Sequence, residues 1–121
     1  AGLMGEKELV SRVADAAEKT GELVWPMPLP AELRALINSD IADIANAKIG
    51  STAGGMLLAG LFLQEFVGGQ KGDADSRIPW AHLDIAGPAH NSGGGYGFVG
   101  KGPTGVTVRA LLALAEEFSR P

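Results

Sequence analysis

The residues best suited to chemistry in this sequence are two histidines and an aspartate that lie close together. His82 and Asp84 form an H-x-D pair, and His90 follows six residues after Asp84. Residues two apart on a β-strand share one face, so His82 and Asp84 could supply two ligands of a two-histidine, one-carboxylate iron site. Alternatively, both are half-buried polar side chains that tie the end of a strand to neighbouring backbone. No cosubstrate anchor lies nearby, which favours the second interpretation.

A glycine-rich stretch beyond these residues suggests a second chemistry, phosphate binding. Gly95 to Lys101 matches the G-x-x-x-x-G-K part of a phosphate-binding loop and also contains G-x-G-x-x-G. Against a nucleotide site, Gly102 stands where a serine or threonine should hold Mg²⁺, and Pro103 follows where a helix N-terminus should offer N–H groups. The alternative is a long loop whose glycines permit positive φ angles and close backbone approach.

Nucleophilic catalysis has no better support. Ser92 lies near His90 and Asp84 in the sequence, but the chain contains no G-x-S-x-G elbow. None of the 14 aspartates and glutamates forms a convincing acid–base pair on a predicted common face. Taken alone, the sequence therefore offers no catalytic residue and no metal ligand that can be assigned.

Composition narrows the class of protein further. The 121 residues are enough for one domain, and a hydrophobic share of 45% can fill a substantial core. A net charge of −4, without any basic run, gives nucleic acid no electrostatic attraction, and the lack of cysteine excludes disulfides, thiolate nucleophiles and cysteine-ligated zinc. The longest apolar stretch, 53–63, falls far short of the ~20 residues of a membrane span. We therefore expect a cytoplasmic, globular domain with no nucleic-acid or membrane partner.

Hydrophobic periodicity places the candidate residues among four helices and a few short strands. Apolar residues recur at helical spacing between Leu9 and Ala17, and Lys19 and Gly21 predict the end of this first helix. Further helices are predicted at 30–39, at 53–67 with Ser51 or Thr52 as cap, and at 105–119 with Thr104 as cap. The remaining predicted elements are short strands at 23–25 and 41–46, a polar loop at 68–77 and a buried strand at 80–86.

The predicted helices need more partners than the chain supplies. The helix at 53–67 is apolar all round and must be covered on more than one side, with Gly54, Gly55 and Gly60 indicating close packing against its backbone. The last helix carries one apolar stripe, formed by Val108, Leu111, Leu112, Ala115 and Phe118. A sheet with one clear strand seldom forms an independent core, so the sheet is predicted to be incomplete.

Five blocks of the sequence follow one another as they do in a known enzyme family. Trp80 to Gly87 reads W-A-H-L-D-I-A-G, and Gly102 to Leu111 is similar to G-A-T-G-x-x-V-R-x-L, with Pro103 replacing the usual small residue. The blocks at 21–29, 39–46 and 53–67 agree in order. Together they resemble the leucyl (cytosol) aminopeptidases, which are hexameric two-metal exopeptidases. The resemblance covers about residues 2–118 and corresponds to roughly the last quarter of the family's chain.

This resemblance implies a fold class and a place in a larger protein. It implies an α/β fold, a partial α/β/α sandwich in which helices pack on a small mixed sheet that an upstream part would complete. Residues 1–121 would form the C-terminal portion of a metallo-aminopeptidase catalytic domain. A homo-oligomer, the family's hexamer, and a peptide substrate are implied for the whole enzyme.

The resemblance also implies which functional residues the chain contributes. The family holds two divalent ions, zinc or manganese, with an N-T-D-A-E-G-R segment and an earlier lysine- and aspartate-containing segment, neither of which has a counterpart here. No catalytic residue or metal ligand is therefore carried over, and we expect this chain alone to be inactive. Ala86 and Ala89 match positions that wall the pocket for the substrate's first side chain. The alternative is a non-catalytic binding or assembly module of the same ancestry.

Overall fold

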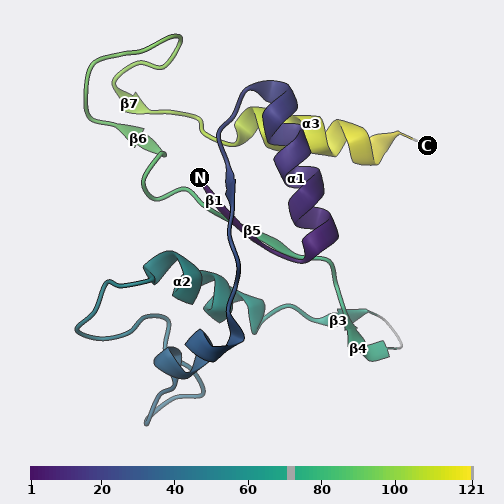
Figure 1. Cartoon of the computed structure of the whole chain (residues 1–121), viewed down its shortest axis with the longest axis vertical. Helices are drawn as coiled ribbons and strands as arrows, with labels where there is room; N and C mark the ends of the chain where they lie inside the picture. Colours follow the sequence, from purple (N-terminus) through teal and green to yellow (C-terminus); the bar gives the residue numbers. More distant parts are fainter. Residues whose placement is uncertain (71–72, 121) are drawn as a thin grey trace.

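A small mixed sheet lies at the centre of the computed structural model, which describes residues 1–70 and 73–120 (Figure 1). Strand β1 (Gly2–Gly5) is the middle strand. It pairs in parallel with β2 (Trp25–Pro26) and antiparallel with β5 (Ala81–Asp84). The mixed sheet agrees with the predicted fold class.

Helices cover both faces of β1. Leu3 and Met4 are both fully buried, and as successive strand residues they point to opposite faces. Helix α2 (Gly55–Gln64) covers the Met4 face, where a Cβ added to Gly60 would lie 2.9 Å from the Met4 sulfur. Helix α1 (Lys7–Thr20) contacts β1 from the other side and packs on α3 (Val108–Ser119) (Figure 1). The layers are therefore helix, sheet and helix.

Helix α1 follows its local sequence signals closely. The Glu6 carboxylate accepts hydrogen bonds from the backbone N–H groups of Glu8 at 2.9 Å and Leu9 at 2.8 Å. These two bonds hold the pKa of the Glu6 carboxyl below its ordinary value. At the other end Gly21 takes the left-handed conformation with φ of 72° and closes the helix, as predicted.

The second helical segment is a 3₁₀ helix, η1 (Ala31–Ile37), and not the α-helix predicted at 30–39. The N–H of Ala45 donates to the Ile37 carbonyl at 2.8 Å, so the returning chain takes an acceptor that a longer helix would use. Ile37 forms a core with Leu58 and Leu61 of α2. This core lies on the α2 side of the sheet.

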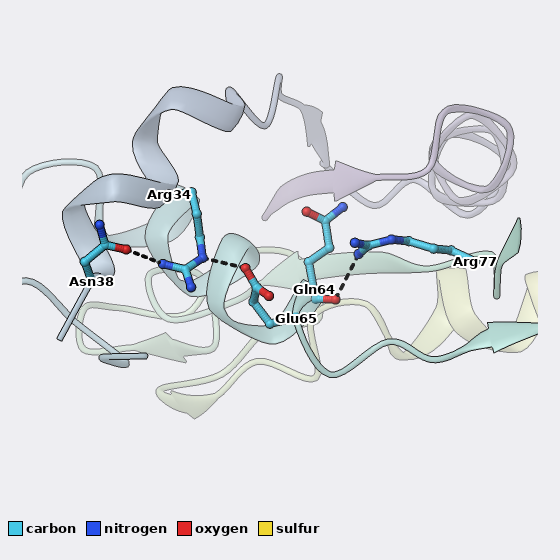
Figure 2. Close-up of polar contacts among 5 residues, drawn as sticks. All are labelled: Arg34, Asn38, Gln64, Glu65 and Arg77. Atoms are coloured by element: carbon cyan, nitrogen blue, oxygen red, sulfur yellow. Dashed lines mark hydrogen bonds and ion pairs between the residues drawn. The ribbon is translucent and has the colours of Figure 1, made fainter. Parts of the chain in front are cut away.

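Polar contacts join the elements around the end of α2 (Figure 2). Arg34 of η1 forms an ion pair with Glu65 and donates a 2.9 Å hydrogen bond to Asn38. Arg77 donates to the Gln64 carbonyl at 3.3 Å. These contacts link the 3₁₀ helix and the strand that ends at residue 77 to the C-terminal end of α2.

Several local predictions are wrong. Residues 41–46 form bends instead of a strand, and the Ser39 hydroxyl accepts hydrogen bonds from the Ile41 and Ala42 N–H groups. α2 begins after Gly54, in the left-handed region at φ of 65°, so neither Ser51 nor Thr52 caps it. Adding a Cβ to Gly54 or Gly55 would meet open space, so close packing is confirmed at Gly60 alone of the three glycines.

Some strands of the structure are not predicted from the sequence. Within the predicted loop at 68–77, β3 (Gly69–Gln70) pairs antiparallel with β4 (Asp73–Arg77), while residues 71–72 lie outside the described residues. β1 itself is also unpredicted, because its four residues include two glycines and its partner β5 lies far along the chain. Among the helices of residues 1–70 and 73–120, none combines the length and hydropathy needed to cross a bilayer.

Candidate functional site

The candidate site is the turn that follows β5, which carries both predicted pocket residues. The Asp84 carboxylate accepts a 3.1 Å hydrogen bond from the Ala86 N–H, and the Ala89 N–H donates to the Ile85 carbonyl at 2.9 Å. Residues 86–89 thus form a closed turn, with Ala86 exposed and Ala89 half-buried. The structure therefore brings Ala86 and Ala89 together on one short, hydrogen-bonded segment.

Thr104 holds this turn from the far end of the glycine-rich loop. Its backbone N–H donates to the Ala89 carbonyl at 3.0 Å, and its hydroxyl donates to the Pro88 carbonyl at 2.6 Å. The pairing continues between β6 (His90–Asn91) and β7 (Gly102–Pro103), which run antiparallel. The turn is consequently fixed to a residue 15 and 16 positions further along the chain than its two bonded partners.

The loop between β6 and β7 is closed by its own polar contacts. The Asn91 amide donates to the carbonyls of Gly94 at 3.0 Å and Gly100 at 3.1 Å. At the tip, Tyr96 and Val99 exchange backbone hydrogen bonds of 2.9 and 2.8 Å. The loop is therefore a hairpin with defined contacts, and its glycines do not make it a flexible linker.

The loop also packs against the start of α3. The guanidinium of Arg109 lies over the Phe98 ring, 4.6 Å from its centroid. A cavity of about 470 Å³ is lined by Arg109, Phe98 and Leu23, and its rim also includes Pro88 and Thr104. Ala86 and Ala89 do not line this cavity. The cavity is thus adjacent to the turn, but it is separate from the two alanines.

A buried carboxylate, which sequence reasoning missed, fixes the N-terminus of α3. Glu22 is 9% exposed and accepts hydrogen bonds from the Thr107 N–H at 2.7 Å and the Ala110 N–H at 2.8 Å. The prediction that Thr104 caps this helix is therefore wrong. Thr107 is the cap residue, it has a φ of 72°, and its side chain makes no capping bond. No local pattern marks Glu22, because its partners lie 85 and 88 residues away.

The structure does not support the metal and phosphate hypotheses. Among the described residues, no three His, Asp or Glu side chains come together in a group that could hold a metal ion, so His82, Asp84 and His90 do not assemble one. The His82 ring instead stacks near Trp80, and its Nε2 is buried without a hydrogen-bond partner. Lys101 is followed by β7 and not by a helix N-terminus, which removes the geometry that a phosphate loop requires.

The same arrangement of elements occurs in solved enzyme structures. The chain superimposes on the bottromycin maturation enzyme BotP, in complex with Mn, with a TM-score of 0.84 and 38% identity over 98% of this chain and 24% of that one. The cytosol aminopeptidase from Coxiella burnetii gives a TM-score of 0.80 and 30% identity, again over 98% of this chain and 24% of the other. The fold is therefore that of the aminopeptidases, and the expected fold class is confirmed.

Sequence comparison identifies the family. The family model "Cytosol aminopeptidase family, catalytic domain" matches residues 1–112, and the chain belongs to that family. A probable cytosol aminopeptidase from Clavibacter michiganensis is 68% identical over 120 residues, which is 98% of this chain and 24% of that protein. The chain spans about a quarter of the length of the curated relatives that it matches. The resemblance found in the five sequence blocks is thereby confirmed.

Proposed function

We propose that this chain forms the C-terminal portion, residues 1–121, of the catalytic domain of a cytoplasmic aminopeptidase that releases N-terminal amino acids from peptides. The observation that carries this proposal is the match of residues 1–112 to the family's catalytic domain. The 68% identity to the Clavibacter relative extends over nearly the whole chain. The complete enzyme is proposed to be a homo-oligomer, the hexamer that the family resemblance implies.

The chain's proposed contribution is a wall of the pocket for the substrate's first side chain, formed by Ala86 and Ala89. Support comes from the turn after β5, which presents both alanines on one segment held by hydrogen bonds at Ile85 and Thr104. Both side chains are single methyl groups, so the wall leaves room for bulky substrate side chains. Subunit contacts are the second proposed contribution, because large apolar side chains such as Trp25 and Phe66 are 73% and 68% exposed.

The two divalent ions of the proposed reaction, zinc or manganese, do not fit the residues that the structure describes. The described residues contain no group of three His, Asp or Glu side chains close enough to hold an ion. Metal ions of this kind polarise a carbonyl and activate a water molecule. Because the donors for them are absent from the described part of the chain, we propose that the chain by itself is catalytically inactive.

A hybrid enzyme tests the proposed function directly. In the Clavibacter protein, the 120 matched residues would be replaced by this chain, and hydrolysis of leucine anilide would be measured with added Mn²⁺ or Zn²⁺. We expect metal-dependent activity close to that of the parent protein. The matched controls are this chain alone and the Clavibacter protein without the exchanged segment, and both should be inactive. An inactive but folded hybrid would contradict the pocket role, and turnover by the chain alone would contradict its proposed inactivity.

A non-catalytic binding or assembly module is the second candidate, and one observation favours it. The predicted apolar stripe of α3 faces outward, with Val108, Leu111 and Leu112 exposed by 62%, 47% and 61%. Ala110, on the other side of the helix, is the buried residue. Exposed stripes of this kind mark surfaces that bind another protein segment. This module should self-associate, and a monodisperse monomer in light scattering that binds no hydrophobic dye would contradict it.

A further inference from the structure

Thr104 makes an unusual set of contacts for a residue on the approach to a helix. Its backbone N–H and its hydroxyl reach the carbonyls of two consecutive residues, Ala89 at 3.0 Å and Pro88 at 2.6 Å. The same hydroxyl oxygen accepts a 3.3 Å hydrogen bond from the Val106 N–H. Thr104 therefore connects the turn after β5 to the start of α3 through three hydrogen bonds.

These contacts determine where the turn can lie. Within the turn, the Ala89 N–H donates to the carbonyl of Ile85, the residue that follows β5, and the Ala89 carbonyl accepts from the Thr104 N–H. Pro88 has no N–H, so its carbonyl is the one backbone group through which it can be held. Loss of the Thr104 hydroxyl would remove the hydrogen bond to the Pro88 carbonyl. The backbone hydrogen bonds of Ala86 to Asp84 and of Ala89 to Ile85 and Thr104 would remain, so the change would centre on the peptide unit between Pro88 and Ala89. Rotation of that peptide unit would change the direction in which Ala89 presents its methyl group.

We propose that Thr104 is a positioning residue for substrate selectivity, because its hydroxyl fixes the turn that carries Ala86 and Ala89. This proposal rests on the proposed pocket role of these two alanines. Thr104 does not touch the substrate in this proposal and acts only through the backbone of Pro88 and Ala89. Its removal should widen the range of accepted side chains without abolishing the reaction.

Three variants of the hybrid enzyme, compared with its natural Thr104, isolate the effect of the hydroxyl. Thr104→Val removes the hydroxyl and keeps the side-chain shape of the natural residue. Thr104→Ala and Thr104→Ser both lack the methyl group and differ in the hydroxyl alone. The measurements are kcat and KM for leucine, phenylalanine and alanine anilides, together with amide hydrogen exchange across residues 85–91.

We expect the hydroxyl-free variants to change selectivity and local exchange together. The ratio of kcat/KM between leucine and alanine anilides should move toward unity by about two- to tenfold, as the loss of one hydrogen bond predicts, and mainly through KM. Exchange at 85–91 should be faster in Thr104→Val and Thr104→Ala, whereas Thr104→Ser should behave as the natural enzyme. An equal fall in kcat/KM for all three anilides, or unchanged kinetics, would overturn the proposal. Loss of folding in both hydroxyl-free variants would overturn it too, since the hydroxyl would then support the whole fold.

A further variant separates this proposal from the pocket assignment. Ala89→Leu narrows the proposed pocket directly and should lower kcat/KM for phenylalanine anilide more than for alanine anilide. If Ala89→Leu changes selectivity and Thr104→Val does not, the role of Thr104 is wrong and the pocket assignment stands. If Ala89→Leu leaves selectivity unchanged, the pocket assignment is wrong and the role of Thr104 falls with it.

Discussion

The capping of α3 by Glu22 gives a prediction whose size follows from the structure. The carboxylate is buried and accepts two short hydrogen bonds from the backbone N–H groups of Thr107 and Ala110. A negative charge at this end of a helix is also stabilised by the helix dipole. The informative perturbations are Glu22→Gln, which removes the charge, and Glu22→Ala, which removes both acceptors.

The expected losses differ between the two variants. A hydrogen bond from a backbone N–H to a charged acceptor contributes about 1.5–3 kcal/mol, and part of this offsets the cost of burying the carboxylate. Glu22→Ala leaves two buried N–H groups without an acceptor, so we expect a loss of about 3–4 kcal/mol in the free energy of unfolding. Glu22→Gln keeps one amide oxygen but turns its NH₂ group toward the second N–H, and a loss of about 2 kcal/mol follows.

Urea unfolding of the 121-residue chain, followed by far-ultraviolet circular dichroism, measures these losses. A dilution series separates unfolding from any self-association. Glu6 offers a matched control, because its carboxylate also accepts two backbone N–H bonds at a helix start but is exposed to water. Glu6→Ala should cost much less than Glu22→Ala. Equal losses in the two variants, or a Glu22→Gln protein as stable as the natural chain, would refute the reasoning.

Three other predictions follow from single contacts. Gly5→Ala places a Cβ 2.4 Å from a backbone carbonyl oxygen at a φ of 140°, so it should lower the free energy of unfolding by about 2 kcal/mol or more. Gly55→Ala meets open space in α2 and should raise the free energy of unfolding by about 0.5–1 kcal/mol. Thermal unfolding compares the two variants, and effects of the same sign would contradict the packing. Backbone hydrogen bonds lower the pKa of Glu6, so the stability that Glu6 contributes to the fold is complete above its ordinary pKa and is lost as pH falls through the lowered pKa. Glu6→Gln should therefore flatten the acid side of a curve of stability against pH. An unchanged curve would show that Glu6 does not contribute to this pH dependence. Arg109→Ala, which loses the contact with Phe98, should speed proteolytic cleavage within residues 92–101 by about two- to fivefold, while equal cleavage would show that the contact does not hold the loop.

Elements with strong local signals could be predicted from the sequence. The periodic apolar residues of α1, its acidic start at Glu6 and its stop at Gly21 lie within one segment and act on it directly. The strand predicted at 80–86 is found at Ala81–Asp84, because alternating side chains and the residues that end it are also local, but its residues are half-buried and not buried as predicted. The fold class came from the ordered sequence blocks, since neither periodicity nor composition specifies the sheet.

Features that depend on distant partners could not be predicted. β1 has weak strand propensity and exists because it lies between β2 and β5. Thr104 has the residue type and position of a helix cap, yet its hydroxyl goes to Pro88, because Glu22 already binds the free N–H groups of α3. At the candidate site, the resemblance supplied Ala86 and Ala89, but the role of Thr104 follows only from the distances between chain segments.

The packing of α1 on α3 has a consequence for how this polypeptide is made. α1 ends at Thr20 and α3 begins at Val108, so a ribosome completes α1 long before it delivers α3. At ordinary elongation rates the interval is of the order of ten seconds. For that time the buried side of α1, with Val13, Ala16 and Ala17, lacks its contacts with α3, and Glu22 lacks the α3 N–H groups that it binds in the structure. The nascent chain should therefore be a substrate for chaperones until α3 emerges.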